Sequence, residues 1–387
     1  MAIDKELRHL GDATSLVVER LVGPVEGMHR AISGSAFRYV GAPGRPVQAV
    51  HDSMVGGVYA AVRRGAGLLG AGAGLLLANR LTRTSPVSES LNGAGLQAAL
   101  NGVWGDELAA RGNQLAVELS IRADGSAVAV DRASMATAYP EASNHIAILL
   151  HGLGQTERCW EPGLPDRLAD ASLATPVLVR YNSGLSVEQT GTELAELLES
   201  LVGNWPVARP RISLIGYSMG GLVARSAYAA GTVSGHRWIR SARDIVTVGA
   251  PHHGSPVARG ATIGSRILRI TATTRPLGDF IETSSAGIKD LNDGAGVAQA
   301  WEAAGAAASG SVRQHFLAAV VTGRERHPVG VVAGDLIVRV TSAAGRGLDP
   351  RNVRVLGRRR HFSLLSDPDV LDQVMAWLGG GGADAGD

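Results

Sequence analysis

The chain has 387 residues, a formal net charge of +2 at pH 7 and one cysteine, Cys159. A chain of this length can bury the core of one large α/β domain and still carry an accessory region. The near-neutral charge and the short arginine runs argue against a nucleic-acid binder, which needs an extended basic face. Cys159 has no second cysteine to pair with, and the amino terminus shows no basic tip followed by an apolar block, so a cytoplasmic location is the default expectation, with export by another route left open.

Residues 1–140 are predicted to form a mainly helical accessory region. Apolar residues recur at helical spacing from Leu7 and again from Val47. A stretch rich in Gly and Pro separates the two patterns over 33–46. The longest uncharged stretch, 65–78, is shorter than the roughly 20 residues that a membrane span needs, so no transmembrane helix is predicted.

Three roles for this helical region stay open. Its helices can pack on the following domain, lie on a membrane or lipid particle, or mediate dimerisation. Gly70 and Gly74 have the small-xxx-small spacing of close helix contacts, which also suits a buried helix. Packing on the protein itself is favoured, and the oligomeric state is left open.

Residues 141–379 show the alternation of short apolar runs and helical patterns that is typical of βαβ units. Ser186 and Gln189 have capping-box spacing before one helical pattern, and the last helix is predicted around 370–378. The apolar runs predict strands at 145–150, 176–181, 211–216, 244–249 and 316–323. The sequence therefore predicts an α/β fold with a mostly parallel central sheet and helices on both faces, followed by a flexible tail at 380–387.

The segment 255–312 is the longest stretch between predicted strands. Ile263, Ile267 and Ile270 share one helical face there. A cap or lid over an apolar pocket fits this pattern, and so does an ordinary crossover helix with an irregular loop.

The sequence LIGYSMGG at 214–221 follows one predicted strand and precedes a helical stretch. Gly216, Ser218 and Gly220 have the Gly-x-Ser-x-Gly spacing of a nucleophile elbow, a sharp turn that lifts a serine above the sheet. The turn brings neighbouring backbones so close that the flanking positions favour glycine. The competing interpretation is a glycine-rich turn with an incidental serine, because such short patterns also occur by chance.

A serine nucleophile needs a base to remove its proton and an acid to orient that base. In the chain order Ser, acid, His, the sequences GDLIVRV and RHFSLL offer Asp335 and His361. Asp335 follows the apolar run VGVVAG, at a plausible strand end, and His361 lies just before the final helix. The acids Asp279, Asp290, Asp293 and Asp349 compete with Asp335, and an exposed loop histidine is the alternative for His361.

The acyl-transfer chemistry also needs backbone donors for an oxyanion. HGLG at 151–154 follows the first strand of the predicted sheet, so the N–H groups of Leu153 and Met219 are the expected donors, with Gly152 and Gly154 shaping the loop. The adjacent histidines of GAPHHGSP, together with His151, suggest a metal site. Paired histidines without carboxylate or cysteine partners are weak evidence for one, so a loop that borders the active site is favoured.

The motifs ILLHGLG, LIGYSMGG, VTVGAPHHGS, GDLIVRV and RHFSLL, in this order, resemble those of bacterial α/β-hydrolase lipases and carboxylesterases over about residues 145–378. The resemblance implies Ser218 as nucleophile, His361 as base, Asp335 as its orienting acid, and ester hydrolysis through an acyl-enzyme. It implies a small ester or lipid substrate and no metal or organic cofactor. Thioester cleavage, acyl transfer to an alcohol and a non-catalytic protein that binds lipid or a partner are the alternatives.

Overall fold

The computed structural model describes residues 91–252, 285–293, 312–323 and 352–380, together with 26, 30, 45, 48, 49, 52–60, 335, 338 and 340–343. Outside the described residues lie most of the expected helical region before residue 91, most of the expected cap at 255–312, and the tail after 380. The chain divides into two compact units, of which the second comprises 94–106, 117–258 and 285–387. In the first unit, residues 52–60 are helical and Arg30 pairs with Glu26 at 2.6 Å. No helix in the described ranges is long and apolar enough to cross a membrane.

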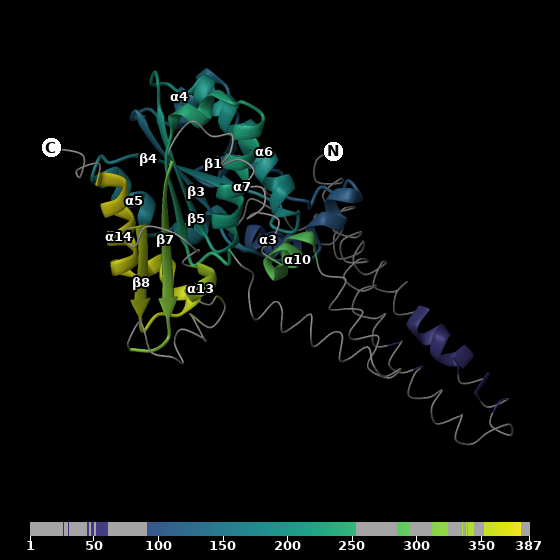
Figure 1. Cartoon of the computed structure of the whole chain (residues 1–387). Helices are drawn as coiled ribbons and strands as arrows, with labels where there is room; N and C mark the ends of the chain where they lie inside the picture. The colour runs from purple at the N-terminus through teal and green to yellow at the C-terminus, as the bar shows by residue number, and fades with distance from the viewer. Residues whose placement is uncertain are drawn as a thin grey trace. The chain divides into compact units, whose positions relative to one another are not determined.

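The second unit is built on an eight-stranded sheet with the order β2-β1-β4-β3-β5-β6-β7-β8 (Figure 1). Strands β3 to β8 pair in parallel, and β1 pairs antiparallel with both β2 and β4. The strands are β1 Ser120–Ala123, β2 Ser126–Val128, β3 His145–Leu150, β4 Thr175–Arg180, β5 Arg211–Tyr217, β6 Ala242–Val248, β7 Arg313–Val320 and β8 Val353–Gly357. The predicted fold class, a mostly parallel sheet with flanking helices, is confirmed.

Two short strands precede residue 141 and join this sheet. Asp124 and Gly125 connect β1 to β2 with φ values of 49° and 77°, the backbone that a tight hairpin turn requires. The sheet thus begins inside the segment that the sequence assigns to a mainly helical region.

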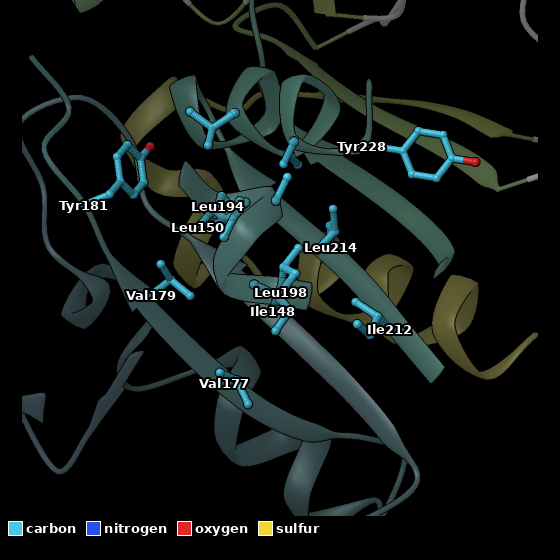
Figure 2. Packing of buried hydrophobic residues seen from close by; sticks show 14 of the residues in the cluster. Ile148, Leu150, Val177, Val179, Tyr181, Leu194, Leu198, Ile212, Leu214 and Tyr228 are labelled. Carbon is cyan, nitrogen blue, oxygen red and sulfur yellow. The ribbon is translucent and has the colours of Figure 1, made fainter. Parts of the chain in front are cut away.

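Helices cover both faces of the sheet, as β3 shows. All six β3 residues are buried, and alternate ones point to opposite faces. Ile146, Ile148 and Leu150 pack in the cluster that includes α6 (Val187–Asn204) and α7 (Met219–Val233), part of which Figure 2 shows. Ala147 and Leu149 pack in the cluster that includes α5 (Leu164–Asp170) and α14 (Pro368–Gly379).

The other helical elements are shorter or lie outside these two layers. They are α3 Leu91–Ala110, α4 Arg132–Ala138, α10 Ala286–Asp293 and α13 Val340–Ala343, with 3₁₀ turns η3 Glu157–Trp160, η4 Arg237–Ser241 and η6 His361–Ser366. Helix α6 begins where its cap predicts, because the Ser186 side chain accepts a hydrogen bond from the Gln189 N–H at 3.1 Å.

Candidate active site

Strand β5 ends in a sharp turn that carries Ser218 into helix α7. Ser218 has φ 52° and ψ −119°, a strained conformation for a residue with a side chain. A Cβ placed on Gly216 would lie 2.3 Å from the carbonyl carbon and oxygen of Gly220, and one on Gly220 would lie 2.4 Å from the Leu150 carbonyl oxygen. The two glycines are therefore required by the close approach of backbones that the elbow creates.

Ser218, His361 and Asp335 form a continuous hydrogen-bonded chain. His361 Nε2 lies 3.0 Å from Ser218 Oγ, and His361 Nδ1 lies 2.7 Å from Asp335 Oδ2. The His361 and Asp335 side chains are 4% and 1% exposed. Because the carboxylate can only accept, Nδ1 carries the proton and Nε2 accepts from the serine hydroxyl. The structure thus brings together three residues that are 143 and 26 positions apart in sequence.

Further hydrogen bonds fix the histidine and the acid. Asp335 Oδ1 accepts from the Val338 N–H at 2.8 Å, and the Asp335 carbonyl accepts from the His361 N–H at 3.1 Å. The Tyr217 hydroxyl donates to the His361 carbonyl at 3.2 Å. Burial, helped by the nearby Asp335 charge, raises the pKa of Tyr217, so this phenol remains a neutral donor.

Both predicted oxyanion donors lie close to the serine. Met219 is the first residue of α7, so its N–H has no partner within the helix. A Cβ on Gly152 would lie 3.3 Å from the Ser218 Cβ, which puts the loop containing Leu153 beside Ser218. The Gly154 N–H donates to Ser183 Oγ at 2.9 Å, whereas no described residue accepts a hydrogen bond from the N–H of Leu153.

Helix α3 supports this loop, a role that the sequence reasoning missed. A Cβ on Gly102 would lie 2.9 Å from the Gly154 Cα, so the helix backbone rests directly against the loop. The helix is kinked at Trp104 (φ −136°, ψ 20°), where its carbonyls bind outside partners. Gly102 O accepts from Ser285 Oγ at 2.7 Å, and Gly105 O accepts from Asn182 Nδ2 at 2.9 Å. Glycines inside a helical pattern were the available signal, since they often mark a packing contact.

The histidines weighed as metal ligands have other partners. His151 donates from Nδ1 to the Gly152 carbonyl at 2.8 Å and accepts at Nε2 from the Tyr181 N–H at 3.2 Å. Burial lowers the pKa of His151 to about 4, so its ring is neutral. His252 contacts Arg225 and Thr247 through its two ring nitrogens. Within the ranges described, no three His, Cys, Asp or Glu residues gather as a metal site, and His253 lies outside those ranges.

The loop after β6 borders the same site, as expected. A Cβ on Gly249 would lie 3.3 Å from the His361 imidazole, and the Ser218 N–H donates to the Val248 carbonyl at 2.8 Å. The end of β6 thus lies next to both His361 and the elbow.

A family model described as a PGAP1-like alpha/beta domain matches residues 195–286, which contain the elbow and β6. The parallel sheet, the strand–elbow–helix turn after β5 and the order Ser, Asp, His along the chain are those of α/β-hydrolases. Together with the family match, they define the class of protein: the chain is an α/β-hydrolase-fold protein. The fold that the resemblance implies is thereby confirmed.

Several solved structures are similar to this chain. The mature lipase BlEst2 of Bacillus licheniformis has 18% identity and a TM-score of 0.42, over 60% of this chain and 91% of that one. A lipase-esterase related protein from Clostridium acetobutylicum has 14% identity and a TM-score of 0.35, over 60% and 93%. Phospholipase PlaB from Legionella pneumophila has 17% identity and a TM-score of 0.32, over 51% and 45%. None of the curated protein sequences compared with this chain matches it.

Proposed function

We propose that the chain is a serine hydrolase that cleaves carboxylic esters through an acyl-serine intermediate. The observation that carries this proposal is the hydrogen-bonded chain from Ser218 through His361 to Asp335, with the serine on a strained elbow. The two predicted donors, Leu153 and Met219, flank the same serine and supply a place for the oxyanion.

Each group has one role in the proposed reaction. His361 Nε2 takes the hydroxyl proton as Ser218 Oγ attacks the ester carbonyl, and Asp335 stabilises the imidazolium that forms. The carbonyl oxygen becomes an oxyanion that accepts hydrogen bonds from the N–H groups of Leu153 and Met219. His361 then gives its proton to the departing alcohol, and a water molecule activated by the same nitrogen hydrolyses the acyl-serine. This chemistry uses no metal or organic cofactor.

The substrate and the setting follow from the same proposal. A small ester or lipid would donate the acyl group, with thioester cleavage or acyl transfer as the outcome when a different donor or acceptor enters the site. A cytoplasmic protein that contacts a membrane or lipid particle peripherally fits this substrate. In the proposed layout, residues 1–140 are a mainly helical accessory region, 141–379 are catalytic, and a cap within 255–312 shapes the pocket.

The test is hydrolysis of p-nitrophenyl esters of short and long acyl chains by the wild type and by Ser218→Ala. We expect steady-state hydrolysis by the wild type and none above background by the variant, with the acyl-chain preference separating esterase from lipase behaviour. Thermal unfolding of both proteins controls for loss of fold. A wild type that is as inactive as Ser218→Ala on every ester and thioester would contradict the proposal and leave the non-catalytic alternative.

A further inference from the structure

Positive charge is concentrated just before His361. Residues 324–360 contain nine arginines and three acidic residues, although the whole chain has a net charge of only +2. Within the part of this segment that the structure describes, Arg354 lies exposed on the edge strand β8, and Arg358 and Arg360 are exposed beyond its end. An anionic partner is the natural complement of such a segment.

Arg359 makes ion pairs within the fold, whereas its neighbours Arg358 and Arg360 are exposed. Arg359 binds Asp367 through Nε at 2.9 Å and also contacts Asp369, so its charge is used within the fold. Arg358 and Arg360 make no ion pair with any residue of the described chain. Arg358 has φ 59° and donates its N–H to the Thr322 carbonyl at 2.9 Å, which fixes the turn at the end of β8.

Phe362 adds an exposed aromatic ring to these cations. Its side chain is 74% exposed, and its ring lies edge-on to the His361 imidazole, with centroids 5.7 Å apart and planes at 83°. A single exposed apolar side chain is common on protein surfaces. An exposed phenylalanine that contacts the proposed base and follows Arg358 and Arg360, which make no ion pair with any described residue, is a more specific combination.

We propose that Arg358, Arg360 and Phe362, here named the basic–aromatic rim, dock the catalytic face on an anionic lipid surface. Arginines near such a surface contribute about 1 kcal/mol each, and an aromatic ring settles at the boundary between headgroups and acyl chains. A soluble polyanion would attract the two arginines but give Phe362 nothing to enter. Because Phe362 contacts His361, a lipid surface that meets the rim lies next to Ser218.

The experiment is co-sedimentation of the full chain with phosphatidylcholine vesicles, with and without anionic phosphatidylglycerol, at low and high salt. The rim variant is Arg358→Gln/Arg360→Gln/Phe362→Ser. A matched control is Arg209→Gln/Arg243→Gln/Val233→Ser, since these exposed residues lie near the amino end of β5, at the start of β6 and at the end of α7. They undergo the same change in charge and also replace an exposed apolar side chain by serine, but toward the amino ends of the parallel strands.

We expect the wild type and the control to bind anionic vesicles several-fold more tightly than neutral ones, and salt to weaken that binding. The rim variant should bind anionic vesicles at least about tenfold more weakly, while unfolding thermally like the wild type. Equal binding by rim variant and control would overturn the proposal, as would equal binding to neutral and anionic vesicles. Heparin binding that Phe362→Ser leaves unchanged, without vesicle binding, would instead assign the arginines to a soluble polyanion.

Binding and catalysis are measured separately in this design. Ser218→Ala should sediment with anionic vesicles like the wild type. If the protein hydrolyses no ester, the vesicle-binding experiment can still be interpreted. If it binds no vesicles, the hydrolysis experiment can still be interpreted.

Discussion

Two clusters of a hydrogen-bonded serine, histidine and aspartate lie at opposite ends of the parallel strands, and only one of them has the arrangement of a catalytic site. At the carboxyl ends are Ser218, His361 and Asp335. At the amino ends, Ser213 Oγ lies 2.9 Å from His145 Nε2 and 3.2 Å from Asp244 Oδ2. The residue types are the same, so the composition of a cluster does not decide its chemistry.

The two clusters differ in order and in access. His361 stands between Ser218 and Asp335, whereas Ser213 stands between its histidine and its acid. Ser213 is 0% exposed within strand β5, while Ser218 is partly exposed on a turn. An accessible serine, a histidine between it and the acid, and backbone donors for the oxyanion distinguish the proposed catalytic cluster from a structural one.

The acid of the amino-end cluster also accepts hydrogen bonds from two residues of strand β7. Asp244 accepts from His315 Nε2 at 2.9 Å and from Arg313 Nε at 2.9 Å. Burial alone would raise the pKa of Asp244, but the hydrogen bonds from His315 and Arg313 hold it below its ordinary value. The carboxylate therefore stays ionised and joins strands β6 and β7, with no role in activating a serine.

The largest expected difference is between the two serines. Ser218→Ala should lower kcat for ester hydrolysis by about 10⁶-fold, because the nucleophile is removed. Ser213→Ala should leave kcat within about threefold and lower the free energy of unfolding by about 1 kcal/mol, since His145 loses a hydrogen-bond partner. Parallel kinetics and denaturant unfolding of the two variants check this. A Ser213→Ala variant that folds normally but is inactive would reverse the assignment.

Substitutions of the two aspartates should differ in the same way as those of the two serines, with a smaller loss of kcat. Asp335→Asn should lower kcat by about 10⁴-fold with little change in KM, because the amide no longer fixes the proton on His361 Nδ1. Asp244→Asn should keep kcat and lower the free energy of unfolding by about 2 kcal/mol, because Arg313 loses its counter-charge and His315 loses a charged hydrogen-bond acceptor. Comparable kcat losses in both variants would contradict the distinction.

Two glycines of helix α3 test whether the loop at 151–154, here called the oxyanion loop because it carries the proposed donor Leu153, depends on its contact with that helix. Gly102→Ala should lower kcat by about 10- to 100-fold, because the new methyl group displaces Gly154 and with it the neighbouring Leu153 N–H. Gly95→Ala, on the same helix with open space around it, is the matched control and should retain wild-type kinetics. The measurement is kcat and KM for one soluble ester. Equal kinetics for the two variants would mean that the loop does not need this contact.

The smallest expected effect is the pH dependence of stability, which involves His145 at the start of β3 and His151 just after its end. Burial is the main cause that lowers the pKa values of His145 and His151, the latter to about 4. The unfolded chain therefore binds more protons than the folded one between about pH 6.5 and pH 4, so stability falls as the solution is acidified through that range. For His151 the loss between pH 7 and pH 5 is about 2 kcal/mol.

His151→Asn removes one of these titrating groups. We expect its free energy of unfolding to fall less steeply between pH 7 and pH 5 than that of the wild type, whatever its value at pH 7. Urea unfolding at several pH values measures both slopes, and identical slopes would show that His151 does not supply the effect.

Local patterns in the sequence were enough to predict the buried parallel strands. All five strands predicted from apolar runs are present, because strands covered on both faces read as continuous aliphatic segments. The β1–β2 hairpin was missed, although Asp124-Gly125 is a turn signal that could have revealed it. Strand β8 was also missed, because arginine interrupts its short apolar run at the sheet edge.

The proximity of Ser218, Asp335 and His361 was predictable because the strand order of the fold determines where their loops meet. The support of the oxyanion loop was not predictable. It depends on Gly102 meeting Gly154 and on a kink at Trp104, and no local rule relates contacts so far apart in sequence. The amino-end cluster was missed for the same reason, since His145, Ser213 and Asp244 meet only through strand register.

The most direct test of the central claim is covalent labelling of the folded protein with a fluorophosphonate, followed by mass spectrometry of its peptides. Such reagents phosphonylate a serine, with loss of fluoride, only where a base activates it and an oxyanion site stabilises the adduct. The proposed mechanism predicts one adduct, on Ser218, that is absent in His361→Ala, with Ser213 unmodified. A folded wild type that carries no adduct, or an adduct on another serine, would contradict it.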